Sequence, residues 1–259
     1  MHTIVLATQK GGSGKSTLAI GLALAAQQAG HHVRLIDTDP QATLSSWQCR
    51  RGLIEPLVET IRDADSVAQR LRALDGGGVT LTIIDTASGV TATTKAAIGC
   101  SDLCLIPARP SVADIEATRP TLRITRAGMT PFAFILNQTP IRGRRIDLAA
   151  SALGDAASRE IVDILAQPFI AMRNDHQDAL AAGLAVSEHD AFGKASEEIR
   201  GLWHWVDARL ARATASDDDL RSRPSATTAP RFADLTERMP TMESMSDGGD
   251  AGAAWDACL

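Results

Sequence analysis

A glycine-rich segment near the N-terminus has the residue types of a phosphate-binding loop. Residues 9–16 read Gln-Lys-Gly-Gly-Ser-Gly-Lys-Ser, which fits the usual pattern except that Gln9 stands where the first glycine is expected. Glycines let consecutive N–H groups turn inward around phosphate oxygens at a helix N-terminus, where the dipole favours negative charge. We expect Lys15 to neutralise the β- and γ-phosphates and the Ser16 hydroxyl to bind Mg²⁺. The predicted phosphate-binding residues are Gly11, Gly12, Ser13, Gly14, Lys15, Ser16 and Thr17.

Lys10 adds a second cation near the start of this loop. An ordinary phosphate loop needs only the lysine at its end, here Lys15, to neutralise the phosphates of a nucleotide bound to the same chain. The extra lysine therefore suggests a nucleotide site that two subunits complete.

Three aspartates stand where the apolar runs of two predicted strands end. Asp37 and Asp39 follow one such run, and Asp85 closes the run 81–85. Taken singly, each carboxylate could be a helix cap or a turn former. Three of them downstream of a phosphate loop instead indicate a site that holds Mg²⁺ and its water molecules beside the phosphates.

The elements that must position these side chains alternate between strands and helices. The apolar run 3–7 predicts a buried strand before the loop, and apolar residues at helical spacing up to Gly30 predict a helix after it. Further strands are predicted at 33–37, 81–85, 102–107 and 131–137, with helices at about 64–75, 91–99, 111–127, 147–158, 174–183 and 194–212. This alternation predicts an α/β fold, a parallel sheet flanked by helices on both faces, whose carboxyl edge carries the ligand.

The composition divides the chain into a folded part and an acidic tail. The chain has 259 residues and a formal net charge of −5. Residues 213–259 carry four Arg and nine Asp or Glu, so residues 1–212 have no net charge. Apolar periodicity stops near residue 213, which predicts a nucleotide-binding domain over 1–212 and a disordered tail over 213–259. A short helix around Phe232–Met239 stays open as an alternative.

Membrane and disulfide signals are absent from the sequence. No apolar stretch reaches the roughly 18 residues of a membrane span, and the N-terminal strand runs straight into a polar loop without a signal peptide. We therefore expect a cytoplasmic protein. No CxxC pair is formed by the cysteines, which favours free thiols over a metal site or disulfides; they are Cys49, Cys100, Cys104 and Cys258.

A stretch of six arginines without an acidic residue lies between residues 117 and 146. A charge run is usually a solvated helix face, yet such a face commonly carries both signs. The stretch therefore favours contact with nucleic-acid phosphates, which is independent of base sequence and weakened by salt. The arginines are Arg119, Arg123, Arg126, Arg142, Arg144 and Arg145.

These segments together resemble the ParA family of partition ATPases, within the deviant-Walker group that includes MinD and the nitrogenase iron protein. The resemblance covers roughly residues 3–212 and is to a short type without an N-terminal DNA-binding domain. It rests on the loop 9–16, Asp37-Thr-Asp-Pro-Gln41, Ile84-Asp-Thr86, Ile106-Pro-Ala-Arg-Pro-Ser111, Leu136-Asn-Gln138, Asp178-Ala-Leu-Ala-Ala-Gly183 and Gly193-Lys-Ala195. The chain departs from the family pattern at Ala87-Ser88, where a Pro-rich stretch is usual.

The resemblance implies a role for each site residue. Lys10 would cross the dimer interface to the phosphates of the partner's ATP, while Lys15 serves its own. Asp39 would position the attacking water, and Asp37 and Asp85 would support Mg²⁺ and its waters. The side chain of Asn137 would face adenine. Arg109 is open to two interpretations, a switch residue or a salt-bridge partner.

The implied function is slow ATP hydrolysis that times the life of a dimer. With ATP and Mg²⁺ the homodimer would bind nucleoid DNA without sequence specificity, until a ParB-like centromere-binding or adaptor protein stimulates hydrolysis. The cargo is plasmid or chromosomal DNA in the main hypothesis, and a carboxysome, chemoreceptor cluster or conjugation complex in the alternative. A MinD-like membrane regulator is disfavoured because Ser244–Leu259 is acidic rather than basic and amphipathic. An iron–sulfur carrier of this fold would need a Cys pair at a dimer interface, and the sequence offers none. A metabolic ligase of this fold stays a further alternative.

Overall fold

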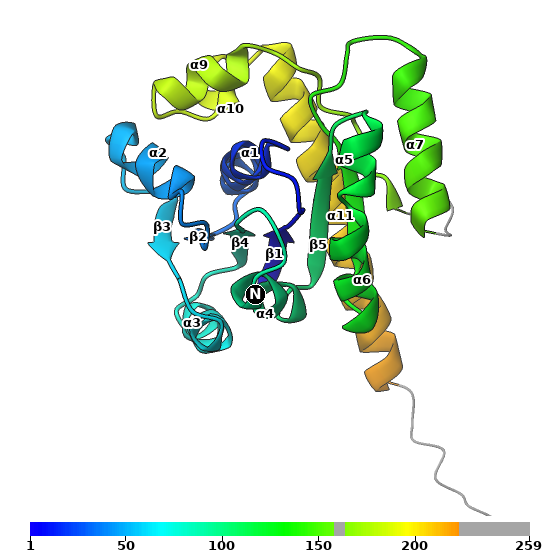
Figure 1. Ribbon diagram of the computed structural model, residues 1–259. Coiled ribbons are helices and arrows are strands. Elements are labelled where there is room, and N and C mark those ends of the chain that lie inside the picture. Colours follow the sequence, from blue (N-terminus) through cyan, green and yellow to red (C-terminus); the bar gives the residue numbers. More distant parts are fainter. Residues whose placement is uncertain (158–163, 223–259) are drawn as a thin grey trace, which may run out of the picture. The chain divides into compact units, whose positions relative to one another are not determined.

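A six-stranded sheet forms the centre of the structure, a computed structural model that describes residues 1–157 and 164–222 (Figure 1). Its strand order is β3-β2-β4-β1-β5-β6, and all neighbouring strands are parallel. The strands are β1 (His2–Leu6), β2 (Val33–Asp37), β3 (Leu57–Thr60), β4 (Leu81–Asp85), β5 (Leu103–Ala108) and β6 (Phe132–Leu136). Strands buried on both faces read as nearly continuous apolar runs. The predicted α/β fold with a parallel sheet is confirmed.

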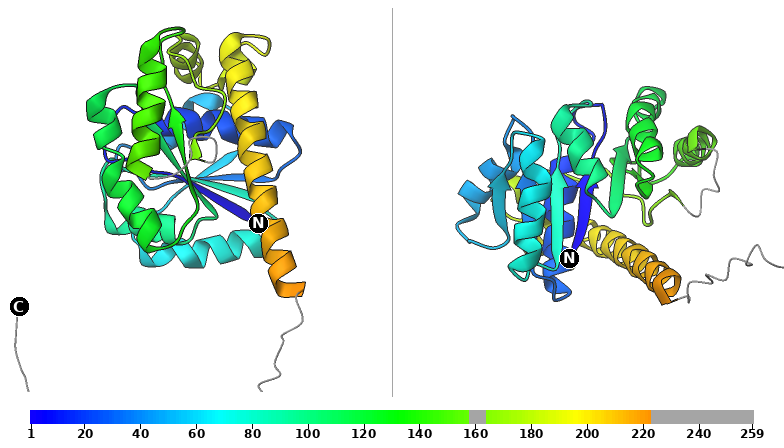
Figure 2. Two further views of the ribbon diagram at one scale, coloured as in Figure 1. Left: turned by 90° about the vertical axis from the view of Figure 1, so that its right-hand side faces the viewer. Right: turned by 90° about the horizontal axis from the view of Figure 1, so that it is seen from below.

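Helices cover both faces of this sheet, as Figures 1 and 2 show. Side chains of α1, α2, α9, α10 and α11 pack in the core on one face, and those of α3, α4, α6 and α7 pack on the other. The helices are α1 (Lys15–Gln28), α2 (Thr43–Arg51), α3 (Asp65–Gly76), α4 (Ala92–Gly99), α5 (Val112–Glu116), α6 (Arg119–Ala127), α7 (Arg144–Ala157), α9 (Asp175–Ala181), α10 (Val186–His189) and α11 (Lys194–Ser222).

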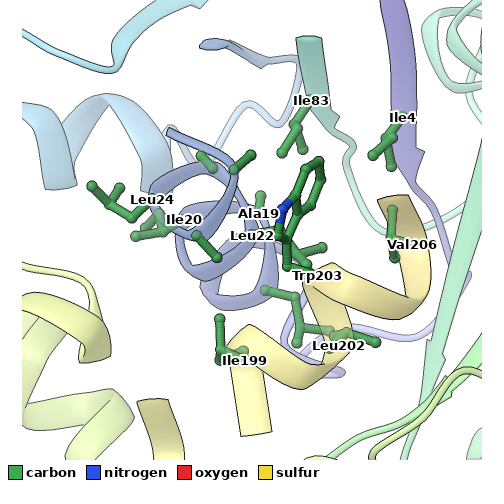
Figure 3. Packing of buried hydrophobic residues seen from close by; sticks show 14 of the residues in the cluster. Ile4, Ala19, Ile20, Leu22, Leu24, Ile83, Ile199, Leu202, Trp203 and Val206 are labelled. Carbon is green, nitrogen blue, oxygen red and sulfur yellow. The ribbon is translucent and has the colours of Figure 1, made fainter. Parts of the chain in front are cut away.

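The helix that follows the phosphate loop is anchored by close packing against α11. Trp203 of α11 is buried among side chains of α1, β1 and β4 (Figure 3). A Cβ on Gly21 of α1 would lie 3.2 Å from two carbon atoms of Ile199, so the absence of a side chain at Gly21 lets the two helices approach. Burial of such aliphatic and aromatic side chains is the main stabilising term of the fold, at roughly 1.5–3 kcal/mol for each fully buried large side chain. The loop is therefore carried by a rigid helix.

The register of the parallel strands brings the predicted acids to one edge. Leu6, the last residue of β1, pairs with Asp85 of β4, and Asp85 also pairs with Asp37 of β2. The phosphate loop follows β1, which is the central strand between β4 and β5. In open α/β sheets this carboxyl edge is where ligands bind.

Several elements differ from the prediction. The strand β3 and the helices α2 and α10 were not predicted, because β3 is a half-buried edge strand and the helices are short. The helix predicted over 111–127 is two helices, α5 and α6. Pro120 lacks an N–H group to continue the first helix but fits the first turn of a new one.

The last described helix, α11, extends to Ser222, ten residues beyond the predicted end at 212. No Gly or Pro, the two residues least favourable in a helix interior, interrupts the sequence between Ala213 and Arg223. Met1–Asp218 forms one compact unit. Residues 223–259, with the helix suggested at Phe232–Met239, lie outside the described residues. Within 1–157 and 164–222, no helix is long and apolar enough to cross a bilayer.

Candidate active site

The phosphate loop turns through glycines at the N-terminus of α1. Gly12 and Gly14 have φ angles of 72° and 92°, in the left-handed region that L side chains rarely adopt. A Cβ on Gly14 would also lie 2.2 Å from Nδ2 of Asn137. That Nδ2 donates a hydrogen bond to the carbonyl of Ser13 at 2.7 Å, and Nε2 of Gln138 donates to the carbonyl of Gly12 at 3.0 Å. The segment after β6 therefore holds the loop from outside.

Lys15 is a buried cation at the first position of α1, with 6% of its surface exposed. Its Nζ donates to Oγ of Ser88 at 3.4 Å. Burial lowers the pKa of Lys15, and the negative charges of Asp85 and Asp39 partly offset this. Burial of an ammonium group is costly unless a strong anionic partner is present. A polyphosphate held at the helix N-terminus would supply that partner.

Ser16 and Asp85 form the part of the site that fits a divalent cation. Oγ of Ser16 donates to Oδ2 of Asp85 at 2.5 Å. Asp85 is fully buried, and burial raises its pKa to about 7 against the opposing effects of the Ser16 hydrogen bond and the Lys15 charge. Its Oδ1 has no hydrogen-bond partner among the described residues. This unsatisfied oxygen is suited to accept a hydrogen bond from a metal-bound water.

The donor set matches Mg²⁺ that arrives with a nucleotide. Within the described part of the chain, no cluster of three or more His, Cys, Asp or Glu side chains could hold a metal ion. Mg²⁺ commonly binds through one or two protein oxygens, substrate phosphates and several waters rather than in a full protein cage. Ser16 and Asp85 provide such oxygens next to the phosphate loop.

Asp37 is buried, and hydrogen bonds engage both of its carboxylate oxygens. Oδ1 accepts from the backbone N–H of Asp39 at 3.0 Å, and Oδ2 accepts from the N–H and hydroxyl of Ser45 at 3.2 Å each. Arg62 lies 3.8 Å from Oδ1. The carboxylate thus fixes the turn after β2 and the first turn of α2. This arrangement favours a positioning role for Asp37 over direct metal ligation.

Asp39 lies on that turn and is half-buried. Its Oδ1 accepts from the N–H of Gln41 at 2.9 Å, and its carbonyl accepts from Nη1 of Arg62 at 2.6 Å. Asp39 is near enough to Lys15 to raise its pKa. This carboxylate therefore lies on the side of the sheet edge that carries Lys15.

Lys10 is bound within its own chain in this structure. Its Nζ lies 2.6 Å from Oδ2 of Asp114, which is 3% exposed. Asp114 also accepts hydrogen bonds from Nε of Arg109 at 2.9 Å and from Oγ of Ser111 at 2.5 Å. Burial acts to raise the pKa of Asp114, but these three donors outweigh it and lower the pKa. Arg109 is thus a salt-bridge partner here.

Sequence reasoning missed Asp114 and Ser111 as neighbours of the site. The signal that could have found them is the Ser-Val-Ala-Asp spacing, because Ser111 is the N-cap of α5 and accepts a hydrogen bond from the N–H of Asp114. Their contact with Lys10, however, joins residues 104 positions apart. Only the fold brings them together.

A pocket lies beside the phosphate loop. Its walls come from the phosphate loop and α1, the segment after β6, and α9 with the segment before it. They are lined by Gly14, Thr17, Leu18, Asn137, Gln138, Ala171, Met172, Arg173, His176, Gln177 and Leu180. Burial lowers the pKa of His176, whose Nε2 has no hydrogen-bond partner in the described part of the chain. Asn137 lines this pocket, and its contact with adenine stays a prediction; Met172, Arg173 and His176 were not anticipated.

The six arginines are all exposed. Arg119, Arg123 and Arg126 recur at helical spacing along one face of α6. The other three lie at or just before the start of α7. One donor of Arg126 is taken by the carbonyl of Ala157, at the end of α7. The stretch is therefore divided between two helices on the same side of the sheet.

A parallel sheet whose central strand leads into a phosphate loop and helix defines the P-loop class of nucleotide-binding proteins. Residues 4–137 match the sequence profile of the CobQ/CobB/MinD/ParA nucleotide binding domain. The chain belongs to this family, and the predicted membership of the ParA group of deviant-Walker proteins is confirmed at that level.

Two relatives match different shares of the chain. Protein ParA of Rhizobium radiobacter is 29% identical over 126 residues, which are 48% of this chain and 56% of that protein. The chain thus spans little more than half the length of this relative. Maintenance of carboxysome distribution protein A of Gloeothece citriformis (strain PCC 7424) is 28% identical over 236 residues, covering 73% of this chain and 90% of that protein.

The fold agrees with solved structures. A Cyanothece McdA variant in complex with ATP superposes with a TM-score of 0.64 at 20% identity, covering 83% of this chain and 96% of the other. At this identity the likeness shows the fold.

Proposed function

We propose that the chain is an ATPase whose ATP- and Mg²⁺-dependent homodimer positions DNA or another cargo. The observation that carries the proposal is the cluster of a buried Lys15, the hydroxyl of Ser16 and the unsatisfied Oδ1 of Asp85 at the N-terminus of α1. A phosphate loop alone could bind nucleotide. Buried, partly unsatisfied groups of both signs fit a magnesium–triphosphate better than either ion alone.

Hydrolysis would use groups at the carboxyl ends of β1, β2 and β4. In the reaction, a water oxygen forms a bond to the γ-phosphorus and the bond from that phosphorus to the β–γ bridging oxygen breaks, giving ADP and phosphate. Asp39 orients the attacking water, and Lys15 holds the phosphates as charge moves to the leaving oxygen. Bound Mg²⁺ would neutralise the β- and γ-oxygens. Asn137 and the pocket beside it would hold adenine.

Dimer formation would depend on Lys10. Its own phosphate loop already has Lys15, and Lys10 is paired with Asp114 at the mouth of the site with a third of its side-chain surface exposed. In the dimer, Lys10 leaves Asp114 and reaches the phosphates bound by the partner. Hydrolysis removes the γ-phosphate that makes this contact favourable, so the nucleotide times the life of the dimer.

The exposed arginines of α6 and α7 would supply the DNA surface. Arginine contacts to phosphates carry no base specificity and weaken with salt through release of counterions. Dimerisation doubles the number of such contacts, which explains why DNA binding would follow ATP. We infer a nucleoid-associated cytoplasmic protein that a ParB-like or adaptor partner releases.

The second candidate cargo is a protein-shelled body. The relative named for carboxysome distribution aligns over a larger share of this chain than Protein ParA does. The ATPase cycle would be the same, because the cargo is chosen by the partner protein.

Sedimentation of the protein on DNA of random sequence tests the main proposal. With a non-hydrolysable ATP analogue and Mg²⁺, we expect a dimer that binds DNA and is released by a few hundred millimolar salt; with ADP, we expect a monomer. Lys10→Ala should bind the analogue as a monomer, while Lys15→Ala should fail to bind it. Equal DNA binding with the ATP analogue and with ADP would contradict the transport role. A Lys10→Ala protein that dimerises with the analogue like the wild type would contradict the shared site.

A further inference from the structure

The segment after β4 holds a hydroxyl over the phosphate loop. Oγ1 of Thr86 donates to the carbonyl of Leu6 at 2.8 Å, and the N–H of Gly89 lies 3.4 Å from the carbonyl of Thr8. Gly89 has a φ of 99°, which turns the chain back after Ser88. The segment is thus fastened, on both sides of Ser88, to the end of β1 that leads into the loop.

Two distances locate the Ser88 hydroxyl. It lies 3.4 Å from Nζ of Lys15 and 3.4 Å from the position that a Cβ on Gly11 would take. Ser88 is exposed, so its hydroxyl is open to a ligand. It is not needed to cap the following helix, because Thr91 is the N-cap of α4 and accepts from the N–H of Thr94 at 3.0 Å.

We propose that Ser88 recognises the terminal phosphate of the nucleotide and thereby distinguishes ATP from ADP. Lys15 reaches the β- and γ-phosphates in a phosphate loop, and a hydroxyl in contact with its ammonium lies within reach of the same oxygens. Without a nucleotide, the hydroxyl accepts from Lys15. With ATP, Lys15 turns to the phosphates and the hydroxyl donates to a γ-oxygen, as its donor and acceptor capacity allows.

This inference rests on the proposed ATPase function and adds a residue to it. In ADP the γ-oxygens are missing, so the hydroxyl returns to Lys15. Ser88 would therefore contribute to triphosphate binding and leave diphosphate binding unchanged.

The test compares Ser88→Ala, Ser88→Thr and the control Ser101→Ala in equilibrium binding of a non-hydrolysable ATP analogue and of ADP, both with Mg²⁺. Ser101 precedes β5 at the opposite edge of the sheet, where its hydroxyl bonds the carbonyl of Ile98. For Ser88→Ala we expect the Kd of the analogue to rise about tenfold, as for loss of a hydrogen bond to a charged group, and the Kd of ADP to change by less than about twofold. Ser88→Thr and Ser101→Ala should bind both nucleotides like the wild type.

Two results would overturn the inference. Ser88→Ala could bind the analogue as tightly as the wild type, or it could lose the analogue and ADP equally, which would show that the hydroxyl acts only through Lys15. Titrations at several protein concentrations separate phosphate contact from dimerisation. Failure of the wild-type protein to bind either nucleotide would instead refute the proposed function itself.

Discussion

Replacing Asp85 with Asn should stabilise the nucleotide-free protein, and increasingly so as pH rises. Burial raises the pKa of Asp85 from an ordinary 3.8 to about 7. Below pH 3.8 the carboxyl is protonated in both the folded and the unfolded state. Between the two pKa values the unfolded state loses its proton first, so the free energy of unfolding falls as pH rises. Above pH 7 the full cost is present.

The magnitude follows from the gap between the two pKa values. A gap of about three pKa units corresponds to on the order of 4 kcal/mol at pH 8, and about a third of that at pH 5. An amide at this position has no charge to bury but keeps a polar group near Ser16. The free-energy effect of exchanging a neutral carboxyl for an amide does not depend on pH. The gain of Asp85→Asn should therefore be larger at pH 8 than at pH 5 by roughly 2–3 kcal/mol.

Urea denaturation of the nucleotide-free protein at the two pH values measures this difference. Asp155→Asn is the matched control, because Asp155 is exposed on α7 and its replacement should change stability by less than about 0.5 kcal/mol at either pH. An equal effect of Asp85→Asn at pH 5 and pH 8 would refute the claim that burial raises the pKa of this carboxyl. The same variant should lose most ATP hydrolysis, since the charge that costs stability is the one that serves the metal.

Three further outcomes follow from the geometry. Gly14→Ala should abolish nucleotide binding and lower the free energy of unfolding by more than Gly30→Ala; both have positive φ, but only Gly14 has a neighbour within 4 Å of the added Cβ. A smaller loss at Gly14 in urea unfolding would contradict this. Replacing the three arginines of α6 by Gln should weaken DNA binding of the ATP-bound dimer and reduce the slope of log Kd against log salt by up to about three per protomer; an unchanged slope would place the DNA surface elsewhere. Asp114→Asn should free Lys10 and tighten the ATP-dependent dimer in sedimentation, whereas a weaker dimer would show that the pair supports assembly.

The phosphate loop and the three acids were predictable because each is recognised from a short segment of sequence. A strand-like apolar run followed by glycines and lysine can be recognised without the rest of the chain, and so can an apolar run that ends in Asp85. Parallel strands then bring their carboxyl ends to one edge. The register of Leu6, Asp85 and Asp37 confirms that step.

The parts that escaped prediction depend on contacts between distant segments. The strand β3 carries Glu59 on a half-buried edge, so its apolar pattern is weak, and only pairing with β2 makes it a strand. Asn137 was identified by its motif, yet its hydrogen bond to Ser13 requires the close approach that Gly14 permits. A raised pKa at Asp85 likewise comes from surrounding burial, which no local pattern encodes.

The two lysines of the loop differ in how well the chain itself balances their charges. Lys15 is buried and its charge is only partly balanced within the chain, so ligand binding relieves a cost that folding leaves in place. Lys10 is instead partly exposed and well paired, since Asp114 meets it at 2.6 Å. An ion pair of this kind must be broken before Lys10 can serve another subunit. In the proposed cycle, nucleotide binding through Lys15 is therefore favourable in the single chain, whereas engagement of Lys10 requires the added attraction of a second subunit's triphosphate. We therefore expect ATP binding to precede dimerisation, and loss of the γ-phosphate to return Lys10 to Asp114.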